Sequence, residues 1–145
     1  MKILIDTNVL LDFIIGREPF YENADKVISL CVDKKIEGYI AAHSITNLFY
    51  IMRKYFSNSE SREIIINLLE FLDVIQIDKN KLIMSLKDDS FKDFEDRLQV
   101  ECAKSLKIDY LVTRDLSDYA NSEIECYTPD IFVNKILNFP TSILG

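Results

Sequence analysis

The stretch that decides the fold is Met1-Lys-Ile-Leu-Ile-Asp-Thr-Asn8, in which an apolar run ends abruptly at Asp6. A continuous apolar run of this kind is typical of a strand buried on both faces, as in a parallel sheet. A carboxylate that directly follows such a strand is costly unless it has a partner. The segment therefore predicts a buried strand that delivers an acid to one edge of a sheet.

Further short apolar or alternating runs follow along the chain, and longer helical patterns separate them. Strands are expected at residues 3–5, 39–42, 74–77, 110–112 and 123–127. Helices are expected at residues 8–15, 20–32, 44–55, after a cap at Ser59, at residues 93–106 and from Thr128-Pro129 onward. Ser44 is the expected cap of its helix, and Ile64, Ile65, Leu68, Leu69 and Leu72 are the expected buried face of the helix after Ser59. This alternation predicts an α/β protein, a three-layer α/β/α sandwich around a parallel sheet of about five strands.

Length and composition fit one domain spanning residues 1–145. A hydrophobic fraction of 48% is ample for a core, and three Gly and three Pro argue against a turn-rich β-sandwich. The net charge of -7 argues against tight non-specific binding of nucleic acid by the bare protein. The three cysteines have no metal-ligand spacing, and no stretch is long enough to span a membrane. We therefore expect a soluble, cytoplasmic protein with reduced thiols.

The acids fall at positions where parallel strands end. Asp6 follows the first strand, Asp115 follows the fourth, and Asp96 lies in the first turn of the helix before the fourth strand. Asp93 shares a helical face with Asp96, whereas Glu95 is expected to point away from both. If the first and fourth strands are neighbours, Asp6, Asp96 and Asp115 converge. Converging carboxylates repel, and a hard cation such as Mg²⁺ or Mn²⁺ relieves the repulsion.

A purely structural interpretation stays open for most of these acids. The helix dipole favours carboxylates in a first turn, which explains Asp93, Glu95 and Asp96 without any metal. Asp115 and Asp118 are also common turn formers. In the helix that carries Phe94, Leu98, Cys102 and Leu106 as its predicted core stripe, Asp96 projects from a different side.

Three segments together resemble the PIN domain, the PilT N-terminal domain. They are Met1 to Asp12 at the start of the chain, Asp93-Phe-Glu-Asp96 followed by Ala103, and Leu111-Val-Thr-Arg-Asp115. The resemblance covers nearly the whole chain and implies strand order 3-2-1-4-5. It also implies a Mg²⁺- or Mn²⁺-dependent ribonuclease with an RNA substrate. Small members of the family are often toxins of toxin–antitoxin pairs similar to VapC, which implies an antitoxin protein as partner and a homodimer.

The resemblance also assigns roles to individual residues. The catalytic and metal-binding acids are Asp6, Asp96 and Asp115, with Asp118 as the alternative to Asp115; Asn8 braces the first acid, and Thr113 is the hydroxyl residue after the fourth strand. The family's second acid, a Glu, is replaced here by Asn47 in Ser44-Ile-Thr-Asn47. An amide brings no charge, and Asp93 is the residue expected to restore it. The alternative function is a catalytically weak PIN domain that binds RNA or protein.

Other readings of the motifs are weaker. A response-regulator receiver needs an acidic pair at the first strand and a Lys after the last, and a haloacid-dehalogenase-type phosphatase needs an Asp where Asn8 stands. The only histidine, His43, is expected to be a polar residue at a helix start rather than a catalytic base. Candidate contacts to RNA phosphates are Arg17, Arg53, Lys54 and Arg114, and Leu48, Ile51 and Tyr55 are expected in the core or at a dimer surface.

Overall fold

The computed structural model describes residues 1–138, and in it five parallel strands form one sheet in the order β3-β2-β1-β4-β5. The strands are β1 (Lys2–Ile5), β2 (Glu37–Ala41), β3 (Leu72–Ile75), β4 (Tyr110–Val112) and β5 (Glu125–Tyr127). The predicted strand order is confirmed, and β1 and β4 are neighbours with Ile5 paired to Val112. Because these partners end their strands together, the residues that follow them meet at the same edge of the sheet.

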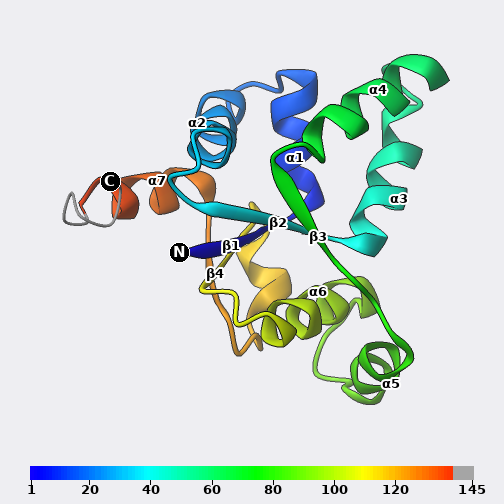
Figure 1. The fold of residues 1–145 in the computed structure, drawn as a ribbon. Helices are drawn as coiled ribbons and strands as arrows, with labels where there is room; N and C mark the ends of the chain where they lie inside the picture. Colours follow the sequence, from blue (N-terminus) through cyan, green and yellow to red (C-terminus); the bar gives the residue numbers. More distant parts are fainter. Residues whose placement is uncertain (139–145) are drawn as a thin grey trace.

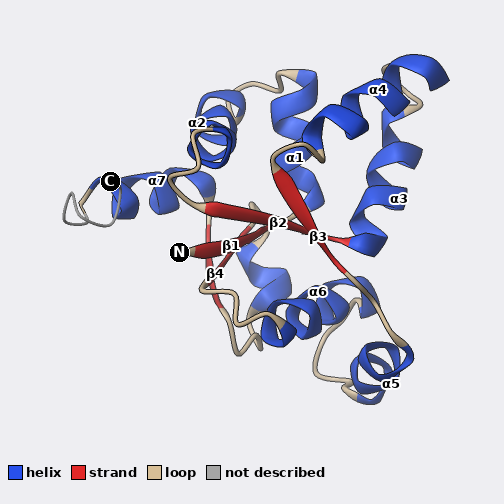
Figure 2. Cartoon of the chain, in the orientation of Figure 1, coloured by secondary structure: helices blue, strands red, loops and turns tan. Residues whose placement is uncertain are grey.

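Helices cover both faces of the sheet, as the predicted three-layer sandwich requires (Figure 1). They are α1 (Thr7–Ile15), α2 (Tyr21–Val32), α3 (Ala42–Met52), α4 (Asn58–Leu68), α5 (Lys79–Lys87), α6 (Phe94–Ser105) and α7 (Pro129–Leu137), with a 3₁₀ helix η1 (Leu116–Tyr119) after β4. One face carries α1 to α4 and α7, and the other carries α5 and α6 (Figure 2).

Burial of the central strand β1 on both faces explains why its sequence is a continuous apolar run. Ile3 and Ile5 belong to the core cluster under α1 to α4 and α7, whereas Leu4 belongs to the cluster under α6. All three side chains are fully buried. Alternate side chains of a strand point to opposite faces, so a strand covered on both faces must be apolar at every position.

Several predicted boundaries are wrong for local reasons. The helix after Tyr55 is capped by Ser57, whose hydroxyl and backbone amide exchange hydrogen bonds with Glu60, so Ser59 lies inside it. Leu72 starts β3 and pairs with Gly38 instead of lining that helix, and Leu69 is exposed. The helix predicted from Ser44 begins earlier, at Ala42, because β2 runs directly into it. Ser44 is therefore a buried interior residue rather than a cap.

The predicted core stripe of α6 is half right. Leu98 and Cys102 are buried, but Phe94 and Leu106 are exposed. Arg97 and Gln99 are buried instead, which a hydrophobic pattern does not predict. Among residues 1–138, no helix is both long enough and apolar enough to cross a bilayer.

Gly38 in β2 offers a direct test of the packing around the central sheet. A Cβ there would lie 2.6 Å from Cys31 Sγ and 2.6 Å from Leu72 Cδ2, so both of these buried side chains would have to shift to accommodate it. We expect Gly38→Ala to lower the free energy of unfolding by about 1–3 kcal/mol, the usual cost of overpacking. Urea denaturation measures this, and Cys31→Ala in the same chain should recover part of the loss. An unchanged midpoint for Gly38→Ala would contradict the tight approach.

Candidate active site

Asp6 leaves β1 and caps α1, and hydrogen-bond donors surround its carboxylate. Oδ1 accepts from Thr7 N at 2.7 Å and from Gln99 Nε2 at 3.0 Å. Oδ2 accepts from Thr113 Oγ1 at 2.8 Å and from the Tyr119 hydroxyl at 3.2 Å. Burial nevertheless raises the pKa of Asp6 against these hydrogen bonds, and the nearby Asp115 charge adds to the rise. The carboxylate is held in one orientation, in surroundings that penalise its charge.

Thr113 connects Asp6 to Asp115. Its fully buried hydroxyl donates to Asp6 and accepts from the backbone amide of Asp115 at 3.1 Å. The amide group of Asn8 donates to Asp115 Oδ2 at 3.1 Å and lies 3.4 Å from Thr113 Oγ1. Asn8 was expected to brace Asp6, but its hydrogen bonds go to the loop after β4. It therefore orients Asp115, the acid at the exposed side of the cluster.

Asp96, at the start of α6, joins the cluster through Tyr119. The hydroxyl of this buried tyrosine lies 3.2 Å from both Asp6 Oδ2 and Asp96 Oδ1. Burial and then the charge of Asp6 raise the pKa of Asp96 to about 7. Since a phenol has one proton, it can donate to only one carboxylate at a time. A proton on Asp96 completes a chain in which Asp96 donates to Tyr119 and Tyr119 donates to Asp6.

A cavity of about 280 Å³ opens beside Asp6, between α3 and α6. Asp6, Thr7, Asn47, Tyr50, Ile51 and Glu95 line it. The Asn47 side-chain amide donates to Glu95 Oε1 across this cavity. Glu95 was expected to point away from Asp93 and Asp96, and its side chain reaches Asn47 because the start of α6 faces α3. An acid therefore lies next to Asn47, and it is Glu95.

Asp93 and Asp118 lie at the edge of the cluster. Both raise the pKa of Asp96 through their charge, and within residues 1–138 neither side chain is hydrogen-bonded to Asp6, Asp96 or Asp115. The backbone amide of Asp118 donates to the Asp115 carbonyl oxygen at 3.1 Å. His43 makes a 3.3 Å contact from Nε2 to the Glu95 carbonyl oxygen, and burial lowers its pKa. A neutral imidazole that donates from Nε2 fits this contact, as expected for a structural histidine at the start of α3.

Sequence reasoning missed three residues of the site, namely Gln99, Tyr119 and Glu95. Gln99 and Tyr119 are buried and bind Asp6. Gln99 carries one weak signal, since it lies three positions after Asp96 among buried residues of the same helix. Nothing in the sequence assigns Tyr119 to the carboxylates, because a 3₁₀ turn aims it back at them.

The basic residues expected to touch RNA have different surroundings. Arg114 binds the buried Asp12 through Nε at 2.5 Å and Nη2 at 3.2 Å, and Arg17 lies 3.6 Å from the same carboxylate. Arg53 stacks over Tyr50, with 4.4 Å from its guanidinium carbon to the ring centroid, at the margin of the cavity. Lys54 is exposed just past the end of α3. Only Arg53 is placed beside the cavity that contains Asp6.

The carboxylates of Asp6 and Asp96 are chemically suited to a hard divalent cation, although in residues 1–138 they are not part of a group arranged around one ion position. Asp6 and Asp96 both have raised pKa values, so a cation between them would relieve burial and mutual repulsion at once. Oxygen donors of this type are those that Mg²⁺ and Mn²⁺ prefer. Within the described residues, no three His, Cys, Asp or Glu side chains are already arranged around one ion position. A cation would thus draw Asp6 and Asp96 together and displace the proton held by Asp96.

Comparison with known proteins agrees with this architecture. The sequence model of a family described as PIN domain matches residues 2–117. The chain is 26% identical over 137 residues to "Ribonuclease VapC1" of Aquifex aeolicus (strain VF5), covering 92% of this chain and 94% of that protein.

Similar folds occur among solved structures. A toxin–antitoxin complex from Klebsiella pneumoniae contains a chain with a TM-score of 0.66 and 21% identity, covering 87% of this chain and 96% of the other. The structure of VapBC-1 from nontypeable Haemophilus influenzae contains a chain with a TM-score of 0.67 and 15% identity. The match covers 90% of this chain and 99% of the other. At these identities the likeness concerns the fold.

The raised pKa of Asp96 predicts how stability depends on pH in the presence of a chelator. Between its ordinary value of 3.8 and about 7, the folded protein holds a proton that the unfolded chain has released. The free energy of unfolding should therefore fall as pH rises through this window. Asp96→Asn removes this titration. The difference in free energy of unfolding, variant minus wild type, should therefore be more positive at pH 8 than at pH 4.5.

Urea midpoints at several pH values measure this difference. His43 has a lowered pKa and contributes the opposite trend, but it is present in both proteins and cancels in the comparison. Asp33→Asn, at an exposed position after α2, is the matched control and should follow wild type. A difference between Asp96→Asn and wild type that does not change with pH would contradict the raised pKa.

Proposed function

The chain belongs to the PIN domain family, and from this premise we propose that it is a metal-dependent endoribonuclease that hydrolyses RNA phosphodiester bonds. The observation that carries the proposal is the joining of Asp6 to Asp96 through Tyr119 and to Asp115 through Thr113. These contacts gather at the carboxyl ends of parallel strands, where ligands of α/β sheets bind. The relative named as a ribonuclease supports the same reaction.

Asp6, Asp96 and Asp115 are the residues that would hold Mg²⁺ or Mn²⁺. When bound, such an ion activates water and stabilises the oxygens of an in-line phosphoryl displacement. The protein's own contribution is orientation. Thr7 N, Gln99 and Thr113 fix the Asp6 carboxylate, and Asn8 fixes Asp115. With a pKa of about 7, Asp96 in the ion-free protein holds a proton at lower pH that the ion would replace, so affinity for the ion should increase as pH rises toward that value.

Glu95 supplies the charge that Asn47 lacks. Asn47 stands where the family usually has a glutamate, and its amide binds the Glu95 carboxylate in the same cavity as Asp6. Asp93, the residue expected to compensate, does not line that cavity in the described part of the chain. The proposal therefore assigns the fourth negative charge to Glu95, held in place by Asn47.

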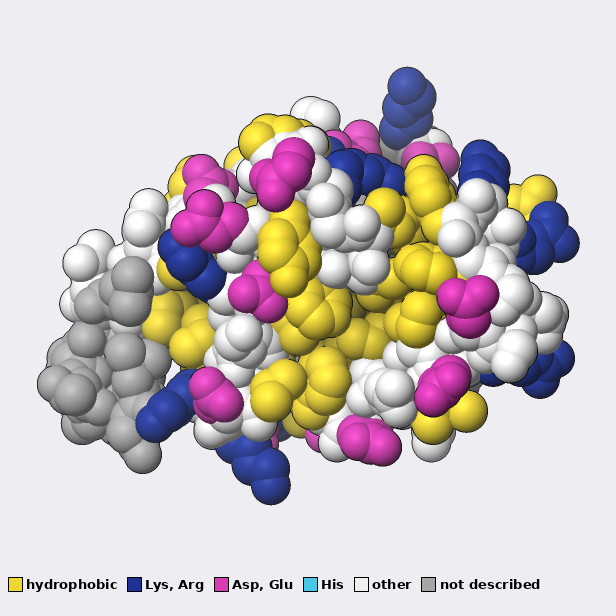
Figure 3. Space-filling view, turned by 90° about the horizontal axis from the view of Figure 1, so that it is seen from above, with side chains coloured by type: hydrophobic (Ala, Val, Ile, Leu, Met, Phe, Trp, Pro, Cys, Tyr) yellow, Lys and Arg dark blue, Asp and Glu magenta, His cyan; other side chains and the backbone are white. Residues whose placement is uncertain are grey.

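We further propose that the protein is the toxin of a toxin–antitoxin pair, works in the cytoplasm and forms a homodimer. The structural neighbour from Klebsiella pneumoniae is part of a toxin–antitoxin complex, which supports an antitoxin as partner. Figure 3 shows hydrophobic side chains gathered in the middle of the face that carries the α1–α4 helices. A cavity of about 490 Å³ on α3 and α4, lined by Ile45, Phe49 and Ile65 among others, supports a protein partner on this face.

A catalytically weak PIN domain that binds RNA or protein remains the second candidate, because Asn47 removes the family's second acid. The proximity of Glu95 argues for the active enzyme. Cleavage measurements separate the two candidates directly.

Wild-type protein with millimolar Mn²⁺ should cleave structured RNA and leave 5′-phosphate and 3′-hydroxyl ends. Chelator should abolish cleavage. Asp6→Asn, purified in the same way, should lose activity by about 10²-fold or more, because a carboxylate at the ion is replaced by a neutral amide. Gel electrophoresis of total tRNA and rRNA measures the products. Equal cleavage by wild type and Asp6→Asn, or none by either, counts against the proposed function.

Glu95→Gln should reduce both Mn²⁺ affinity and RNA cleavage by about tenfold, in the range of groups that orient or tune a metal site. Asp93→Asn is the matched control, an acid at the same helix start, and should have a smaller effect. The exchange of both residues, Asn47→Glu with Glu95→Asn, keeps the charge in the cavity and should retain more activity than Glu95→Gln alone. Calorimetric Mn²⁺ titration and the cleavage assay measure these effects. A larger loss in Asp93→Asn than in Glu95→Gln would return the compensating role to Asp93.

A further inference from the structure

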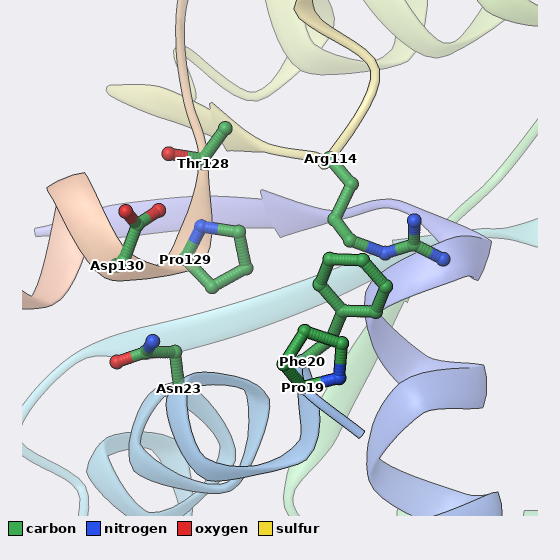
Figure 4. A pocket seen from close by; sticks show the side chains of 7 residues that line it. All are labelled: Pro19, Phe20, Asn23, Arg114, Thr128, Pro129 and Asp130. Atoms are coloured by element: carbon green, nitrogen blue, oxygen red, sulfur yellow. The ribbon is translucent and has the colours of Figure 1, made fainter. Parts of the chain in front are cut away.

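A second cavity, of about 450 Å³, lies beside the loop after β4. Its walls come from the start of α2, from Arg114 after β4, and from the start of α7 (Figure 4). It shares no lining residue with the cavity that contains Asp6. Arg114 directly precedes Asp115, and its backbone amide donates to Asn8 Oδ1 at 3.3 Å. The cavity is therefore next to the proposed catalytic edge without being part of it.

One wall is a platform made by Arg114 and Phe20, which stack on each other. The Arg114 guanidinium carbon lies 4.0 Å from the centroid of the Phe20 ring. Two nitrogens of the same guanidinium bind Asp12, whose carboxylate is fully buried. Although Asp12 also faces Arg17 at 3.6 Å and does not balance both charges, it holds two nitrogens of Arg114, which therefore has fewer N–H groups free to clamp a phosphate. Its fixed plane is instead suited to stacking, and aromatic rings and guanidinium planes are the surfaces on which proteins stack unpaired bases.

The opposite wall offers hydrogen-bonding groups. In Figure 4, Asn23 and Asp130 lie on one side of the cavity, and Phe20 and Arg114 lie on the other. Asn23 carries both a donor and an acceptor, and the exposed Asp130 accepts only. The Thr128 hydroxyl, also on the wall, is buried and has no hydrogen-bond partner among the described residues. A carboxylate here repels a phosphate and accepts from an amino group.

We infer that this cavity, with the Phe20–Arg114 platform on one side and Asn23 with Asp130 on the other, is a subsite for one unpaired nucleobase that carries an exocyclic amino group. The base stacks on the platform, Asp130 accepts from its amino group, and the Asn23 amide binds the adjacent ring nitrogen. The inference rests on the proposed ribonuclease function and adds to it a base preference next to the cleavage site. An amino-bearing base provides the donor that the carboxylate requires, whereas uracil has no amino group.

Titration with mononucleotides tests the subsite without relying on cleavage. The side-chain amide resonances of Asn23 in ¹⁵N-labelled protein should shift on addition of AMP or CMP. UMP should bind about fivefold more weakly or worse, which corresponds to one lost hydrogen bond. Ribose 5-phosphate, which has the sugar and phosphate but no base, should cause no shift. Shifts as large with ribose 5-phosphate as with AMP would show a phosphate site and overturn the inference.

Substitutions at Asp130 and Phe20 test separately what each wall of the cavity contributes to nucleotide affinity. Asp130→Asn should weaken AMP and CMP about fivefold while leaving UMP nearly unchanged. Phe20→Leu should weaken all three bases about fivefold or more, because stacking does not distinguish them. Asp33→Asn, an exposed acid at the opposite end of α2 from Asn23, should behave as wild type. Equal affinities in all four proteins would overturn the inference and leave the cavity to a side chain of a protein partner.

RNA cleavage measured on the same preparations separates this inference from the proposed function. Active wild type with no nucleotide-dependent shift at Asn23 rejects the subsite and leaves the nuclease intact. Nucleotide-dependent shifts in a protein that cleaves no RNA support base binding and reject the nuclease.

Discussion

The buried carboxylate of Asp6 is the constraint on which the rest of the structure depends. A charge at the end of a fully apolar strand is costly unless donors surround it. The chain supplies them from four places, namely the backbone of α1, Gln99 on α6, Thr113 after β4 and Tyr119 on η1. These contacts connect the central strand β1 and its neighbour β4 to α6. Even so, burial keeps the pKa of Asp6 raised, so the site retains an unsatisfied preference for positive charge.

The sheet and the acid at the end of its central strand, Asp6, could be predicted from the sequence for physical reasons. A strand buried on both faces has to be apolar at each position, so Ile3 to Ile5 was recognisable without any other information. Parallel strands that end in register bring their following residues together, so the meeting of Asp6 with the β4 loop follows from the strand order. The resemblance to the PIN domain supplied that order, which local patterns alone do not specify.

Other features depended on tertiary contacts that no local pattern encodes. Glu95 was predicted to point away because helical spacing places it about 100° from Asp96, yet α3 lies on that side too. The site is formed by two helix surfaces rather than one. Tyr119 and Gln99 looked like ordinary core or surface residues, because the sequence shows a residue type and not the acid it faces. The true cap, Ser57, stood two positions from the predicted Ser59, and only the reciprocal contact with Glu60 distinguishes them.

The protein carries a net charge of -7, with which the proposed RNA substrate has to be compatible. Its best-placed arginines are already paired, Arg114 with Asp12 and Arg97 with Asp88 and Glu101, so they add little free positive field. Binding through counterion release is correspondingly weak for the bare chain. The proposed RNA contacts must then come from two sources, a cation held by Asp6, Asp96 and Asp115, and stacking on a plane that Asp12 has fixed. Both need an unpaired, accessible strand, since neither a buried stacked base nor a shielded phosphate can reach them. In the proposed enzyme, the acidic surface that disfavours nucleic acid in general would thereby favour RNA that presents a single exposed base beside the cation.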